Sequence, residues 1–183
     1  LAIGDGALGF WKALVDVWPE AAEQRCWVHR TANVLDKLPK RLQPRAKKHL
    51  HEIFNSETKK AAEEQVRSFV KEYEDRYPKA VASLTKDEEK LLTFYDFPAA
   101  HWQTIRSTNV IESAFATVKL RQRVTKGAGT RTRGLTMAYQ LLAMAEKRWR
   151  AIRSPHLVQH VLDGTKFLDG RPDQEVEEEE RAA

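Results

Sequence analysis

Apolar residues along the first part of the chain recur in patterns that predict two short strands and two helices. Residues 1–3 are typical of the end of a buried strand, and the Gly-Asp-Gly sequence at 4–6 predicts a turn. Apolar residues then follow helical spacing over 7–17. A second short strand is predicted at 25–28, with a helix following from 29 towards 35. This alternation of strand and helix predicts an α/β fold.

The middle of the chain, from 37 to 105, has helical patterns throughout. One helix is predicted at 45–54 and a longer one at 58–77. A capping-box pair, Thr85 and Glu88, predicts a further helix running towards Tyr95. We expect this block to contain no strand and to pack beside the sheet as an insertion. It should expose a basic surface near Lys40, Arg41, Arg45, Lys47 and Lys48.

The last part of the chain predicts two helices joined by a basic loop, followed by a tail. The helices are expected at 109–120 and 135–150, with a loop rich in Gly, Thr and basic residues at 125–134. The second helix should bury Leu141, Leu142, Ala145 and Trp149. The predicted organisation is a core part at 1–36, a helical insertion at 37–105, C-terminal core helices with the basic loop at 106–168, and an acidic disordered tail at 169–183.

Charge is distributed unevenly, and this changes the expected partners. The chain has 31 Lys and Arg against 26 Asp and Glu. Residues 106–153 hold eleven basic residues and two Glu, whereas 169–183 hold seven acids and two Arg. A basic block ahead of an acidic tail indicates a polyanion-binding surface and a solvated terminus. The single cysteine excludes an intramolecular disulfide, and no apolar run predicts a membrane helix, so we expect a reducing, cytoplasmic location and no membrane partner.

Asp5 is the first candidate for chemistry because it follows a strand and lies between two glycines. Ligands bind at strand ends in open α/β sheets, and flanking glycines allow close approach to a carboxylate. The competing interpretation is an ordinary turn residue or a cap for the next helix, since turns strongly favour Asp and Gly. Residue type alone leaves both interpretations open.

Glu112 is the second candidate, and it also has a structural alternative. Asn109 is a good N-cap, so Glu112 could simply complete a capping box. However, Lys119 and Arg123 follow Glu112 by seven and eleven residues, which puts all three on one helix face. A carboxylate heading a row of cations suits a metal-assisted phosphodiester site, because the acid can hold a metal and the cations can hold a nucleic-acid backbone.

The basic segment around the predicted loop is a candidate DNA-binding surface. Its Lys and Arg residues alternate with Thr and Gly, so side chains and backbone amides can both reach phosphates. The alternative is an ordinary solvated face. The candidate DNA-binding residues are Arg106, Lys119, Arg121, Arg123, Lys126, Arg131 and Arg133.

Cys26 and His29 have a C-x2-H spacing that requires a separate interpretation. A structural zinc site needs four ligands, and the only nearby histidines, His49 and His51, have a spacing that points them apart on a helix. A nucleophilic Cys-His pair would need a residue to orient the base, and none is evident. The spacing therefore favours a packed cysteine with a hydrogen-bonded histidine.

Three stretches of the sequence together resemble the Mutator-type transposases, which include a large bacterial insertion-sequence group. Asp5-Gly6 and the helix after it resemble the segment around that family's second catalytic Asp. Two further signatures match in order, Q-x-C-x2-H-x3-N at Gln24, Cys26, His29 and Asn33, and R-x-T-N-x-I-E at Arg106, Thr108, Asn109, Ile111 and Glu112.

The resemblance implies a partial RNase H-like fold with a large helical insertion, and a DDE-type site of three acids binding two Mg²⁺ (or Mn²⁺) ions. Asp5 would be the second acid and Glu112 the third, both catalytic and metal-binding, with Cys26, His29 and Asn109 as structural motif residues near the site. The first Asp would precede this sequence, so we expect the chain alone not to cleave DNA.

The implied function is metal-dependent cleavage and strand transfer at transposon ends. The implied partners are transposon-end and target DNA and further copies of the protein, in a bacterial nucleoid-associated location. Two alternatives remain at this stage. One is a non-catalytic DNA-binding module derived from a transposase, and the other is a structural helical protein whose acids only cap helices.

Overall fold

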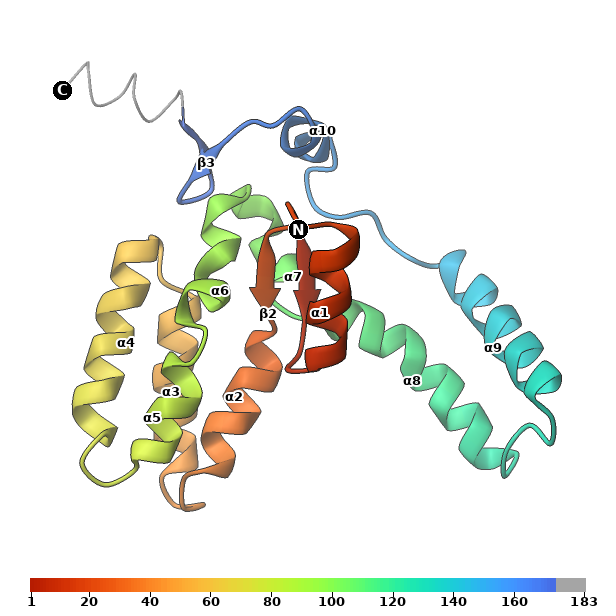
Figure 1. Cartoon of the computed structure of the whole chain (residues 1–183), viewed down its shortest axis with the longest axis horizontal. Helices are drawn as coiled ribbons and strands as arrows, with labels where there is room; N and C mark the ends of the chain where they lie inside the picture. The colour runs from red at the N-terminus through yellow and green to blue at the C-terminus, as the bar shows by residue number, and fades with distance from the viewer. Residues whose placement is uncertain (174–183) are drawn as a thin grey trace. The chain divides into compact units, whose positions relative to one another are not determined.

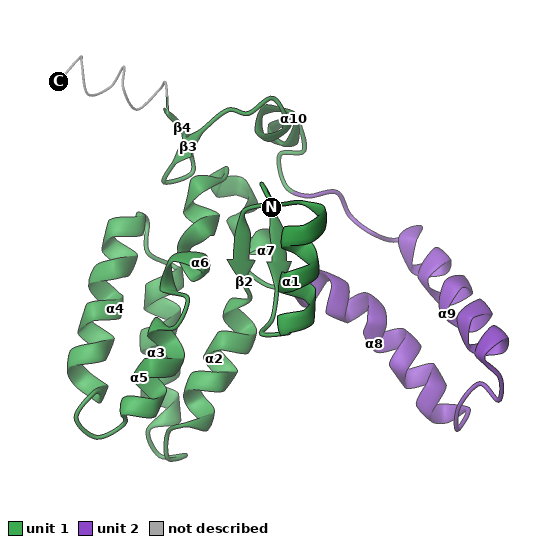
Figure 2. Ribbon diagram, in the orientation of Figure 1, with its two compact units in different colours: residues 1–107, 153–183 green, residues 108–152 purple. Residues whose placement is uncertain are grey.

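The computed structural model of the chain describes residues 1–173. It divides into two compact units, which are coloured separately in Figure 2. The first unit comprises Leu1–Ser107 and the chain from Arg153 onward, and the second comprises Thr108–Ile152. The two units are therefore described one after the other. Both consist mostly of helices, and the short strands lie in the first unit (Figure 1).

The first unit begins with a parallel strand pair joined by a helix. Strand β1 (Ala2–Gly4) pairs with β2 (Glu23–Arg25), with Ile3 opposite Gln24, and α1 (Leu8–Val17) connects them. Helix α1 confirms the helix predicted at 7–17 and buries Trp11 and Leu14, whereas its apolar residues Leu8 and Val15 are exposed. This βαβ unit is consistent with the predicted α/β character of the chain, in a unit that is otherwise mostly helical.

The position of the second strand differs from its predicted position at 25–28. The strand ends at Arg25, and Trp27 is already the first residue of α2 (Trp27–Asp36). Hydropathy misplaced the strand because Gln24 and Arg25 are buried polar residues, whereas the apolar pair Trp27 and Val28 belongs to a helix. The predicted strand at 25–28 is therefore wrong by two to three residues.

Residues 37–105 contain only helices and turns, as predicted. The helices after α2 have the bounds α3 (Gln43–Phe54), α4 (Lys59–Tyr73), α5 (Pro78–Thr85), α6 (Glu88–Leu92) and α7 (Trp102–Ile105), with 3-10 turns η1 (Thr93–Asp96) and η2 (Ala99–His101). The Thr58 hydroxyl caps α4 by accepting from the Ala61 amide at 3.1 Å. The buried faces of α2 to α5 form the core of this helical block (Figure 1).

The predicted capping box at Thr85 and Glu88 does not form. Thr85 is the last residue of α5, and its hydroxyl donates to the Val81 carbonyl at 3.1 Å. The N-cap of α6 is Asp87, which adopts a left-handed backbone conformation with φ of 60°. The chain needs this conformation to turn between two helices, and Asp is one of the few residues that tolerate it.

The described end of the chain returns to the aromatic core of the first unit. After α10 (His156–Leu162), strands β3 (Phe167–Leu168) and β4 (Arg171–Pro172) form a short antiparallel hairpin. The Gly170 amide donates to the Tyr95 carbonyl at 3.0 Å, and the Asp169 carboxylate accepts from the Lys59 amide at 2.7 Å. Residues 169–173 therefore belong to the ordered hairpin, whereas the rest of the predicted acidic tail, 174–183, lies outside the described residues.

The second unit is a hairpin of two helices, α8 (Asn109–Val124) and α9 (Arg131–Glu146). The connecting loop is shorter than predicted, because Thr130 caps α9 by accepting from the Arg133 amide at 3.3 Å. Of the residues expected to be buried, Leu141, Leu142 and Ala145 are half-buried and Trp149 is 59% exposed. Two helices alone cannot enclose a full apolar stripe. Among the described residues, no helix is long and apolar enough to cross a membrane.

Candidate active site and nucleic-acid interface

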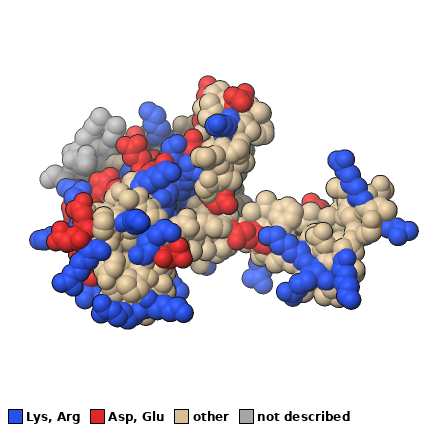
Figure 3. Space-filling view, turned by 60° about the horizontal axis from the view of Figure 1, so that its bottom comes forward, with Lys and Arg blue, Asp and Glu red and all other residues tan. Residues whose placement is uncertain are grey.

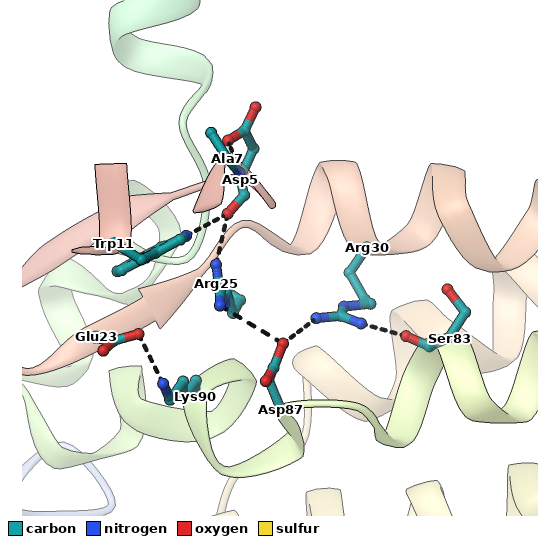
Figure 4. Close-up of polar contacts among 9 residues, drawn as sticks. All are labelled: Asp5, Ala7, Trp11, Glu23, Arg25, Arg30, Ser83, Asp87 and Lys90. Atoms are coloured by element: carbon teal, nitrogen blue, oxygen red, sulfur yellow. Dashed lines mark hydrogen bonds and ion pairs between the residues drawn. The ribbon is translucent and has the colours of Figure 1, made fainter. Parts of the chain in front are cut away.

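Asp5 lies immediately after β1, at the edge where both parallel strands end. Its backbone carbonyl accepts two hydrogen bonds, from the Trp11 indole nitrogen and from Nη1 of Arg25, each at 2.8 Å. Its carboxylate Oδ1 accepts from the Ala7 amide at 2.9 Å, and the side chain is exposed. Figure 4 shows both donors directed at the Asp5 backbone. The acid is thus held firmly through its main chain while its carboxylate stays accessible.

Gly4 makes this arrangement possible by its small size. A Cβ atom at this position would lie only 2.7 Å from Cζ2 of the Trp11 ring and 3.2 Å from the Phe10 ring. The glycine therefore allows the α1 indole to lie directly against the strand, which brings its nitrogen within reach of the Asp5 carbonyl.

Arg25 links Asp5 to a group of charged residues in the helical block. Its guanidinium lies over the Trp11 ring, 4.2 Å from the ring centroid, and pairs with the Asp87 carboxylate at 3.6 Å. Arg30 pairs with the same carboxylate at 3.4 Å and also donates to the Ser83 carbonyl. Burial lowers the pKa of Arg30, and the charge of Asp87 opposes that shift.

A pocket of about 450 Å³ opens beside Asp5 within the first unit. Three residues of the Q-x-C-x2-H-x3-N signature line it together with Asp5, namely Cys26, His29 and Asn33. Cys26 is buried directly before α2, while His29 and Asn33 follow at successive turns of that helix. The structure therefore gathers the predicted Asp and this signature around one cavity.

The remaining signature residue, Gln24, has a structural role that the sequence did not reveal. Its side chain is fully buried, and its amide nitrogen donates to the carbonyls of Arg25 at 2.7 Å and Leu91 at 3.0 Å. Its amide oxygen accepts from the Phe94 backbone at 2.7 Å. Gln24 thus fixes α6 and η1 against β2. The signal that could have found it is a long polar residue directly before the strand predicted at 25–28.

The two nearby histidines have partners of their own within the first unit. His49 lies 3.4 Å from the Glu72 carboxylate, and the His51 ring packs on Phe54 at a centroid distance of 4.9 Å. Neither lines the pocket that contains Cys26 and His29. These contacts favour the interpretation of Cys26 as a packed cysteine over a zinc site that includes the histidines of α3.

Arg106 differs from the other candidate DNA-binding residues because it is half-buried in the first unit. Its Nη1 donates to the Phe54 carbonyl at 2.6 Å and to the Asn55 side chain at 3.1 Å, and the guanidinium lies 4.8 Å from the Phe54 ring centroid. Burial lowers its pKa. In this structure Arg106 secures the C-terminal end of α3, so DNA contact by this residue stays a prediction.

Glu112 lies in the first turn of α8, in the second unit, and its side chain is exposed. The N-cap of α8 is Thr108, so Asn109 is already helical and the alternative of a capping box between Asn109 and Glu112 is wrong. Instead the Thr108 hydroxyl donates to the Glu112 carboxylate. Asp5 and Glu112 belong to different units, and their convergence on one site stays a prediction.

The other candidate DNA-binding residues all lie in the second unit. Because α8 is continuous from Asn109 to Val124, Glu112, Lys119 and Arg123 share one helix face, and all three are exposed. The unit holds nine Lys or Arg and two Glu, whereas the rest of the chain holds 22 basic and 24 acidic residues. The whole positive excess is therefore in the second unit, and Figure 3 shows many Lys and Arg side chains, in blue, on the surface of this unit.

Comparison with known proteins gives a consistent result. Residues 1–151 match the family described as Transposase, Mutator family. The transposase for insertion sequence element IST2 of Acidithiobacillus ferrooxidans is 52% identical over 172 residues, which cover 94% of this chain and 58% of that protein. The transposase for IS6120 of Mycolicibacterium smegmatis is 53% identical over 171 residues, covering 93% and 53%.

A more distant relative is similar over a shorter stretch. The transposase for IS905 of Lactococcus lactis is 31% identical over 119 residues, which cover 65% of this chain and 30% of that protein. The chain thus spans somewhat more than half the length of the two relatives that it resembles most strongly among these three.

Proposed function

Because the chain belongs to the Mutator family of transposases, we propose that it is part of an enzyme that cleaves and joins DNA at the ends of an insertion sequence. In this proposal Asp5 and Glu112 are two of the acids that hold divalent metal ions, and the fold around Asp5 is a part of an RNase H-like domain with a helical insertion. The α8–α9 hairpin is the DNA-binding surface.

Asp5 supports the proposal most strongly. It combines an exposed carboxylate, a backbone carbonyl held by two donors at 2.8 Å, and a position at the end of a parallel strand beside a pocket. An aspartate that only forms a turn needs the hydrogen bond from the Ala7 amide. It does not need the additional hydrogen bond that the Arg25 guanidinium donates to the Asp5 carbonyl. Rigid support of an exposed acid is what a metal ligand requires, because its oxygens must stay within a fixed distance of the ion.

The chemistry of the donors fits the proposed metal. Carboxylate oxygens are the protein ligands that Mg²⁺ prefers, and both Asp5 and Glu112 offer them at exposed positions. When bound, such ions activate the attacking oxygen and stabilise the leaving oxygen of a phosphodiester. The chain's own contribution is to present Asp5 from β1 and Glu112 from α8, and to hold the DNA backbone with Lys119 and Arg123. The Thr108 hydroxyl orients Glu112 within α8.

A strand-cleavage assay tests this function. The complete protein encoded by the gene is incubated with labelled insertion-sequence ends and Mg²⁺ or Mn²⁺. Asp5→Asn and Glu112→Gln should each reduce cleavage by more than about 100-fold, beyond the loss typical of residues that only support a metal ligand. DNA binding should persist, because phosphate contacts need no metal.

Matched controls are available in the same two units. Asp16→Asn removes an exposed acid from α1, and Glu146→Gln removes one from α9. Both should cleave like the unchanged protein. If Asp5→Asn behaves like Asp16→Asn, the proposed role of Asp5 is wrong.

The second candidate function is DNA binding without catalysis, and the charge of the second unit favours it. Nine basic residues against two Glu can hold DNA without any metal. This alternative predicts that the complete protein binds insertion-sequence ends equally well in Mg²⁺ and in EDTA. It also predicts no cleavage product under any metal condition.

A further inference from the structure

Asp87 occupies an unusual backbone position between α5 and α6. It has φ of 60° and ψ of 34°, a left-handed conformation that only a few non-glycine residues tolerate. Its carboxylate lies 3.6 Å from Nη2 of Arg25 and 3.4 Å from Nη2 of Arg30. The carboxylate is thus the meeting point of two guanidinium groups, each of which is only 11% exposed.

Arg25 makes Asp87 a neighbour of the proposed catalytic acid. One arm of its guanidinium donates to the Asp5 carbonyl and the other pairs with Asp87, as Figure 4 shows. The planar fork of arginine fixes the angle between these two contacts. A displacement of the Asp87 carboxylate therefore changes the direction in which Arg25 can donate to Asp5.

We propose that Asp87 is a positioning residue of the active site, acting through Arg25 to hold the backbone of Asp5 and so the direction of its carboxylate. This inference rests on the proposed function of Asp5 as a metal ligand. Asp87 touches neither DNA nor metal in this scheme. Its position in a segment far along the chain from Asp5 also makes the helical block a part of the active-site support.

The balance of charge explains why the arrangement depends on Asp87. The guanidinium groups of two side chains that are each only 11% exposed share one carboxylate, so its loss would leave two cations facing each other with little water to screen them. Within the described residues, Nε of Arg25 is buried and makes no hydrogen bond. Without Asp87, the Arg25 guanidinium would keep its contacts with the Asp5 carbonyl and the Trp11 ring, and repulsion from Arg30 would move it.

The alternative is that Asp87 only stabilises the fold, and the chain offers a matched control for it. Glu23 and Lys90 form an ion pair at 2.9 Å that also links β2 to α6. This pair appears beside the Arg25–Asp87 contact in Figure 4, but it makes no contact with Asp5. Breaking it tests the effect of losing an ion pair between these elements without disturbing the Asp5 backbone.

The experiment compares three variants of the complete protein, Asp87→Asn, Glu23→Gln and Asp5→Asn. Asparagine suits position 87 because it tolerates the left-handed backbone while removing the charge. Mn²⁺ binding is followed by the electron paramagnetic resonance signal of the free ion, and the Mg²⁺ dependence of cleavage is measured in parallel. Thermal melting defines a temperature at which every variant is folded.

Asp87→Asn should raise by about 10-fold the Mn²⁺ concentration that half-saturates binding and the Mg²⁺ concentration that gives half-maximal cleavage. A change of this size is typical for residues that orient a metal ligand. Glu23→Gln should change them by less than about twofold, whatever its effect on melting. Arg25→Lys should act like Asp87→Asn, because an ammonium cannot span both acceptors with a fixed fork.

The outcomes separate this inference from the proposed function. If Asp5→Asn loses Mn²⁺ binding and cleavage while Asp87→Asn matches Glu23→Gln, the positioning role of Asp87 is overturned and the function of Asp5 stands. If Asp5→Asn binds Mn²⁺ and cleaves like the unchanged protein, the proposed function fails, and the inference fails with it.

Discussion

Replacing Gln24 by Met should lower the unfolding free energy of the first unit by more than is usual for a residue in a three-residue strand. Gln24 is fully buried, and its amide oxygen accepts from the Phe94 amide at 2.7 Å. Met has a similar volume but leaves that N–H without a partner, which costs about 1–3 kcal/mol in a buried place. The carbonyls of Leu91 and Arg25 both lose the hydrogen bond from the Gln24 amide nitrogen. The Leu91 carbonyl still accepts from the Trp27 indole nitrogen at 2.8 Å. The expected total is about 2–4 kcal/mol.

Urea unfolding followed by tryptophan fluorescence measures this loss by linear extrapolation. The control is Gln43→Met, since the Gln43 amide also donates to two carbonyls, of Leu35 at 2.9 Å and Leu38 at 3.1 Å, but is only part-buried. Water can replace its bonds, so the control should cost less than about 1 kcal/mol. Equal losses in the two variants would refute the assignment of Gln24 as the residue that fixes α6 to β2.

Three further predictions test glycine packing, DNA contact and alkaline stability. Gly4→Ala should cost about 1–3 kcal/mol in chemical unfolding, because its Cβ would meet the α1 indole at 2.7 Å, whereas Gly9→Ala, with open space around it, should be neutral or stabilising. Lys119→Ala with Arg123→Ala should reduce the salt slope of DNA binding by nearly two units in a salt titration, since each lost phosphate contact releases about 0.9 fewer counterions; an unchanged slope would mean that this face of α8 does not meet DNA. Burial raises the pKa of Tyr73 from its ordinary 10.0 to about 12, so the unfolded chain loses this proton first and stability should fall as pH rises through that interval. Tyr73→Phe should lessen that fall in melting curves taken at about pH 8 and about pH 11.

The sequence was sufficient wherever a feature depended on neighbours along the chain. Helical spacing located α1, α4 and α8, and the Thr58 cap was consistent with the start expected for α4. The charge of the second unit is a property of composition alone. The helix predictions held because periodicity reports which side of a single element faces the core.

Prediction from hydropathy failed at β2, where polar residues are buried. Gln24 and Arg25 lie in β2, which was predicted two residues later, because a buried polar side chain resembles a surface residue until its partners are known. The capping box at Thr85 failed for a related reason. Local sequence allowed it, but the turn into α6 requires the left-handed backbone of Asp87.

The support of Asp5 was decided by the tertiary structure alone. Asp5, Arg25 and Asp87 come from three segments of the chain, and nothing in the sequence near any one of them indicates the other two. These three residues come together because the helical block packs against β2. This packing lets Gln24 hydrogen-bond to Leu91 and Phe94, and it brings the Asp87 carboxylate to Arg25. The sequence by itself determined which acid stands at the end of the strand. Only the packing of distant elements could supply the charges that hold it, because a charge taken out of water is tolerated only where an opposite charge or a hydrogen-bond partner offsets the lost hydration.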